Sequence, residues 1–141
     1  MAITQAMCTS FKEDLLNKVM DLGSGGDTIK IALYTSSASL DSTTTAYSAT
    51  NEVSGTGYTA GGYTLQNQVV ATSGTTAYFD ADDPEWTSAS FTTAGALIYN
   101  DTVAGDNAIA VLSFGGDFTV TSGTFRIVFP DPGLTAIVRI D

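Results

Sequence analysis

The chain has 141 residues, the length of one typical domain, and a domain of this size buries about two thirds of the surface that its unfolded chain exposes. Only 14% of the residues are charged, whereas an average soluble domain has about 25%. Acidic residues outnumber basic ones by 15 to 5, and five scattered cations cannot form the basic stripe that binds phosphates. We therefore expect residues 1–141 to form one domain that does not bind nucleic acid directly.

The start of the chain lacks a basic segment followed by a continuous apolar one, and no run approaches 18 apolar residues. No membrane partner is therefore expected. Cys8 is the single cysteine, which excludes a disulfide within the chain and predicts a buried free thiol. These features are typical of a protein made and assembled in a reducing cytoplasm.

A helix is predicted over about residues 10–22. Ser10 and Glu13 have the spacing of a capping box, and Gly23 follows where a helix commonly ends. Apolar residues recur at helical spacing, and they predict that the helix docks through Leu15, Leu16 and Val19.

The rest of the chain predicts an antiparallel β-sandwich of seven or eight short strands, with an open barrel as the alternative. Residues 27–35 alternate apolar and polar side chains, which indicates a half-buried strand. Further strands are expected at 63–72, 76–81, from Trp86 onward, 91–100, 107–114, 124–129 and 134–140. Turns or strand breaks are expected at 73–74, 82–85, 100–106, 115–117 and 130–133.

Two segments between the first strands are unusually rich in small residues. Residues 36–50 form a long Ser- and Thr-rich loop, which is either a mobile surface loop or an arm ordered against a neighbouring subunit. Residues 51–65 combine glycines with tyrosines and offer Glu52 no obvious partner nearby in sequence. Glycine permits close backbone approach and tyrosine supplies amphipathic area, so this segment predicts an assembly interface. The interface residues are Gly55, Gly57, Tyr58, Gly61, Gly62 and Tyr63.

The side chains offer little catalytic chemistry. The chain has no histidine, so Ser-His-Asp and Cys-His catalysis and His-ligated metals are not available to it, and no cofactor is expected. The one cluster of carboxylates could supply oxygen ligands to Ca²⁺, but it lacks the spacing of a known calcium loop and is more typical of a solvated strand end. It contains Asp80, Asp82, Asp83 and Glu85.

Three aromatic residues have two interpretations. Trp86, Tyr78 and Phe79 could stack on a sugar, as in a carbohydrate-binding module, or they could pack in the core.

Several segments resemble small structural proteins of tailed bacteriophages. They are MCTSFKEDLLN at 7–17, KIALYTSSA at 30–38, EVSGTGYTAGG at 52–62, ALIYN at 96–100 and AVLSFG at 110–115. The resemblance implies a non-enzymatic, homo-oligomeric virion component with a β-rich domain, assembled in the host cytoplasm. A capsid decoration or cement protein bound to the major capsid protein is the expectation, and a neck or tail component is the alternative. No catalytic residues come with the resemblance.

Overall fold

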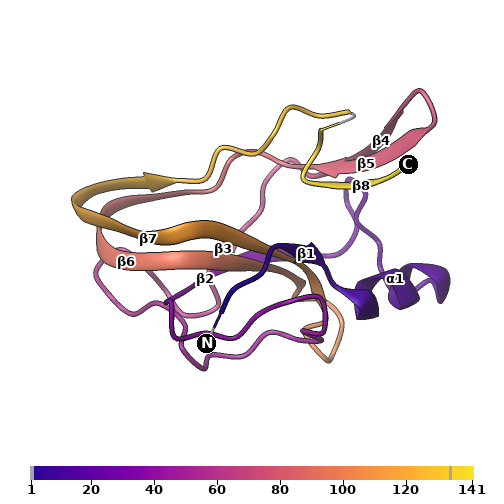
Figure 1. Cartoon of the computed structure of the whole chain (residues 1–141). Helices are drawn as coiled ribbons and strands as arrows, with labels where there is room; N and C mark the ends of the chain where they lie inside the picture. Colours follow the sequence, from indigo (N-terminus) through magenta and orange to yellow (C-terminus); the bar gives the residue numbers. More distant parts are fainter. Residues whose placement is uncertain (1, 134) are drawn as a thin grey trace.

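A computed structural model describes residues 2–133 and 135–141 of the chain. It contains two antiparallel sheets and one short helix, which confirms the mainly β fold with an N-terminal helix (Figure 1). The elements are β1 (Ala6–Met7), α1 (Thr9–Leu16), β2 (Ile29–Tyr34), β3 (Tyr63–Thr64), β4 (Val69–Ser73), β5 (Thr76–Asp80), β6 (Glu85–Asn100), β7 (Ala108–Arg126) and β8 (Val138–Ile140). One sheet has the order β1-β7-β6-β2-β3, and the other has the order β4-β5-β8.

The two longest strands, β6 and β7, form an antiparallel hairpin in the five-stranded sheet. β6 has 16 residues and β7 has 19, so the expectation of short strands is wrong for this pair. The turn predicted at 115–117 is also wrong, because β7 continues through it. Thr93 pairs with Phe118 and Gly95 with Ser113, which leaves residues 114–117 of β7 opposite Ala94 alone. Such a bulge bends a ladder.

Figure 1 shows the result of this bend: the far half of the hairpin curls back over the five-stranded sheet. The segments predicted as separate strands at 107–114 and 124–129 thus belong to one strand, because residues 108–114 and 124–126 both lie in β7. β8 is shorter than the predicted 134–140 strand, and Leu134 lies outside the described residues.

The core lies between the two layers and on both sides of β2. Five of the six residues of β2 are buried, so the prediction of a half-buried strand is wrong. The face of β2 that points away from the smaller sheet is covered by the segment that connects β2 to β3. The Tyr34 hydroxyl donates a hydrogen bond to the Ser48 carbonyl at 2.7 Å, and the Tyr58 hydroxyl accepts one from the Leu33 amide at 2.9 Å.

The loop of residues 36–50 is held by its own chain. The Thr4 amide donates to the Leu40 carbonyl at 2.8 Å, and the Leu40 side chain is 8% exposed. At the other end of the loop, the Ala108 amide donates to the Thr45 carbonyl at 2.9 Å. This segment is therefore neither a mobile surface loop nor an arm that needs a neighbouring subunit to become ordered.

The helix is shorter than predicted. α1 begins after Cys8 without a side-chain cap, and the Ser10 hydroxyl is buried with no hydrogen-bond partner, so the capping-box prediction is wrong. The helix ends at Leu16 because Lys18 has a φ of 62°, outside helical geometry, and Gly23 plays no part in its end. Phe11 is fully buried and anchors α1, whereas Leu16 is 90% exposed and Val19 38% exposed, so their predicted docking is also wrong.

The predicted strand at 63–72 is divided between the two sheets. β3 pairs with β2, whereas β4 pairs with β5 across the predicted turn at 73–74. Gln68 fixes the crossing between them, because its side-chain amide donates to the carbonyl oxygens of Gly23 and Asp27, each at 2.9 Å. The chain leaves the smaller sheet at Asp80, and the predicted break at 82–85 is confirmed for residues 82–84, since β6 begins at Glu85.

These burials predict unequal effects of two truncations in α1. Phe11→Ala should lower the free energy of unfolding by about 3–5 kcal/mol, because it empties a filled core position. Leu16→Ala should change it by no more than about 0.5 kcal/mol, because that side chain is in solvent. Urea unfolding of the two variants checks this. Equal losses of stability would contradict the docking of α1 through Phe11.

Candidate interaction surfaces

An apolar groove lies between α1 and the three-stranded sheet. The register places Val70, Phe79 and Val138 side by side across β4, β5 and β8. Residues two positions along a strand share its face, so Ala77 and Ile140 belong to the same apolar face. The groove has a volume of about 330 Å³, and its lining includes Phe11, Leu15, Met20 and Leu22 from the opposite wall.

The groove leaves several apolar side chains in contact with solvent. Phe79 and Val138 are buried at 2% and 4% exposure, but Val70 and Ile140 on the same sheet face are 50% and 53% exposed. Leu16 lies next to the groove residue Leu15 and is 90% exposed. A group of exposed apolar side chains around a groove is a candidate interaction site, whereas singly scattered ones are normal on a protein surface.

The surroundings of the groove are nearly neutral in an otherwise acidic protein. Residues 9–23 contain two lysines and three acidic residues, β4 contains no charge, and β8 contains Arg139. The ion pairs among the described residues lie elsewhere, between Lys30 and Asp101 at 3.7 Å and between Arg126 and Asp83 at 2.9 Å. A partner can therefore approach the groove with little repulsion.

Two carboxylates of the acidic cluster, Asp82 and Asp83, are engaged within the chain. Asp83 accepts hydrogen bonds from the Arg126 guanidinium and from the Phe129 amide, both at 2.9 Å, and Asp82 accepts one from Asn67. Burial raises the pKa of Asp80, and the neighbouring carboxylates raise it further. Within residues 2–133 and 135–141, no group of three or more Asp, Glu, Cys or His side chains is arranged to hold a metal ion.

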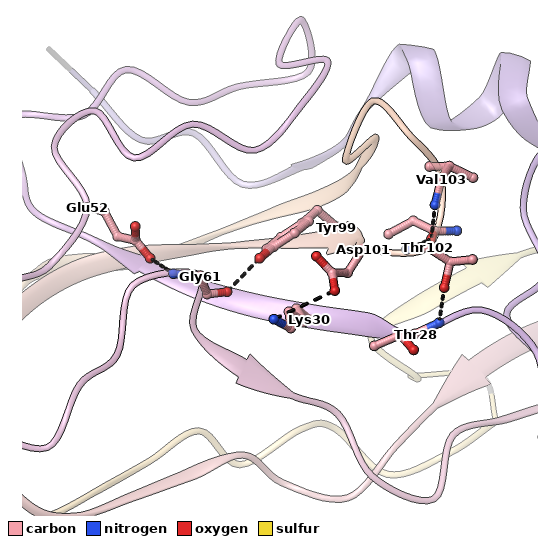
Figure 2. Close-up of polar contacts among 9 residues, drawn as sticks. Thr28, Lys30, Glu52, Gly61, Tyr99, Asp101, Thr102 and Val103 are labelled. Atoms are coloured by element: carbon pink, nitrogen blue, oxygen red, sulfur yellow. Dashed lines mark hydrogen bonds and ion pairs between the residues drawn. The ribbon is translucent and has the colours of Figure 1, made fainter.

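Glu52 organises the Gly- and Tyr-rich segment, and the expectation that it has no nearby partner is wrong. Its carboxylate accepts hydrogen bonds from the Tyr47 hydroxyl at 2.6 Å, from the Tyr58 hydroxyl at 2.5 Å and from the Gly61 amide at 2.8 Å. Figure 2 shows the Gly61 contact beside a second one, in which the Tyr99 hydroxyl donates to the Gly61 carbonyl at 2.6 Å. These bonds fasten the segment to the five-stranded sheet.

The glycines of this segment serve close approach inside the chain. A Cβ atom on Gly62, which has a φ of 86°, would overlap the carbonyl oxygen of Ile31 in β2. A Cβ atom on Gly55 would come within 2.5 Å of the Ser90 carbonyl oxygen in β6. The segment therefore lies directly on the sheet. Contact of Gly55, Gly57, Tyr58, Gly61, Gly62 and Tyr63 with a neighbouring subunit stays a prediction.

Of the three aromatic residues considered for sugar stacking, Trp86 and Phe79 are core residues and Tyr78 is half-buried. Trp86 is 5% exposed and Phe79 is 2% exposed. The Trp86 ring lies 5.7 Å from the ring of Tyr63 and 5.9 Å from that of Phe125, centre to centre. A sugar cannot stack on a face that other rings cover, so the predicted platform is wrong.

Comparisons with protein-family models, with curated proteins and with solved structures found no match to this chain. None of the helices in the described part of the chain is long and apolar enough to cross a membrane.

Gly62 and Gly25 have similar positive φ angles but different surroundings. Substituting each by alanine therefore separates the cost of steric overlap from the cost of the backbone conformation. Gly62→Ala should lower the free energy of unfolding by more than about 2 kcal/mol, because the methyl group meets the β2 backbone. Gly25 has a φ of 78° and open space around its Cα, so Gly25→Ala should cost only about 1–2 kcal/mol. Thermal unfolding of both variants checks this, and a smaller loss for Gly62→Ala would contradict the packing of the segment on β2.

The tyrosines around Glu52 predict a loss of stability at high pH. Burial and the hydrogen bond to Glu52 raise the pKa of Tyr47 to about 12, and the same two causes raise the pKa of Tyr58. A hydroxyl whose pKa is higher in the folded chain stabilises it fully below about pH 10, and this contribution is lost as the pH rises through the folded value. The melting temperature should fall between pH 10 and about 12. Tyr47→Phe should show a shallower fall, and an unchanged slope would contradict the contribution of this hydroxyl.

Proposed function

We propose that this chain is a non-enzymatic structural protein of a tailed-phage virion. In this proposal it assembles with copies of itself and with the major capsid protein as a capsid decoration or cement protein. The observation that carries the proposal is the open apolar groove, where Val70 and Ile140 are each at least half exposed. A protein whose task is attachment needs such a surface.

The distribution of charge supports the same role. A net charge of −10 makes free subunits repel one another, which limits association to surfaces that carry few charges. The groove has few charges around it, so few must lose water when a partner covers it. The resemblance of five segments to phage structural proteins supplies the assignment to a virion.

A neck or tail position is the alternative within the same class, because an apolar attachment surface suits any of these positions. The carbohydrate-binding alternative depended on an exposed aromatic platform. Since Trp86 is packed among other rings, no observation favours that alternative.

Gold-labelled antibody against this chain, applied to intact particles, tests the proposal. Label over the capsid is the expected result. Label confined to the neck or tail would replace the decoration role with the alternative, and absence of the chain from purified particles would contradict the virion role.

A matched pair of variants tests the part played by the groove. Ile140→Asp should lower the number of copies on each particle several-fold, because it places a charge on the apolar face. Val128 is 72% exposed and lies outside the groove, so Val128→Asp should leave the copy number unchanged. Quantitative gel analysis of purified particles measures both. Equal occupancy by the two variants would contradict attachment through the groove.

A further inference from the structure

The four strands at sheet edges differ in how open they are to another strand. β1 and β3 have two residues each, and β8 has three and includes the charged Arg139. β4 is the longest edge strand, with five residues, and its sequence Val-Val-Ala-Thr-Ser contains neither a charge nor a proline. Short length, charge and proline are the features by which proteins protect an edge from pairing.

The outer side of β4 is free of hydrogen bonds to the described residues. Its backbone takes part in the ladder with β5, and no other backbone or side-chain hydrogen bond reaches residues 69–73. Figure 1 shows β4 at the outer margin of the molecule, away from the five-stranded sheet. β4 therefore presents amides and carbonyls on a side that another strand can reach.

The local absence of charge allows a second copy of the chain to pair at β4 despite the net charge of −10. Two molecules that each carry −10 repel one another, and association requires a contact where this repulsion is weakest. No charged residue occurs between Glu52 and Asp80, and β4 lies within this interval. Two antiparallel copies of one edge strand also present matching donors and acceptors across a two-fold axis.

We propose that β4 pairs with β4 of a second copy in antiparallel orientation, so that the two three-stranded sheets join into one sheet of six. The inference deepens the proposed function, because it names the surface through which copies associate. Pairing gives hydrogen-bond partners to the free backbone amides and carbonyls on the outer side of β4 in both copies. It also brings partner side chains against Val70, which is 50% exposed and lies on the apolar face of the sheet.

Cysteine cross-linking of the purified chain tests the pairing. Cysteines are introduced one at a time at Val70, Ala71 and Thr72, since in a two-fold pairing at least one of these positions lies opposite or next to its own copy. Val128→Cys is the control, because Val128 is 72% exposed but lies outside β4. The native Cys8 is 0% exposed, so it does not react.

The expected result is that mild oxidation gives a disulfide-linked dimer for one of the three β4 cysteines, at least ten times more than for Val128→Cys. Equal cross-linking at all four positions would overturn the proposal, because random collisions give that pattern. Absence of any cross-link would overturn it as well.

Sedimentation of the chain provides a second measurement that does not depend on oxidation. The wild-type chain should sediment as a dimer, and Val70→Lys should weaken the dimer at least tenfold while its monomer stays folded by circular dichroism. A wild-type chain that is monomeric at all concentrations would overturn the pairing. Both assays use the purified chain alone, so a chain that dimerises in this way but is absent from particles would contradict only the virion role.

Discussion

The bend in the β6–β7 hairpin is the constraint on which the rest of the structure depends. Four residues of β7, 114–117, lie opposite the single residue Ala94 of β6, and there the ladder turns back over the sheet that it helps to form. The far half of the hairpin brings Trp86 and Phe125 above Tyr63, and these rings join the two layers. It also sets where the chain enters β6 and leaves β7, and thus where the smaller sheet lies.

The position of the smaller sheet explains why we propose it as the interaction surface. The apolar face of its three strands is covered only by α1, which is eight residues long, and by the residues that follow α1. The apolar face is therefore half covered, and the edge at β4 has no neighbour. In the five-stranded sheet, by contrast, residues 36–65 cover β2, and Glu52 fastens their glycine-rich part.

The sequence correctly predicted features that depend only on residues close together in the chain. The β4–β5 hairpin and the break before β6 followed from the turn at 73–74 and from Pro84, which act locally. Gly115 and Gly116 gave the same local signal, yet they form a bulge, because pairing with β6 on both sides continues the strand. The early end of α1 coincides with the positive φ of Lys18, a residue type that gives no such signal in the sequence. The Glu52 cluster had a signal, a single carboxylate between Tyr47 and Tyr58, but only the fold shows that both hydroxyls reach it.

The central claim is that the edge strand β4 pairs with β4 of a second copy of the chain. Amide hydrogen exchange, measured on dilute and on concentrated protein, tests it most directly, because pairing protects edge amides that are otherwise open to water. The account predicts that some amides within residues 69–73 gain protection as the concentration rises, whereas exposed amides of the hairpin bend at 115–117 do not. Exchange at β4 that is independent of concentration, in a sample that nonetheless contains dimers, would contradict the claim.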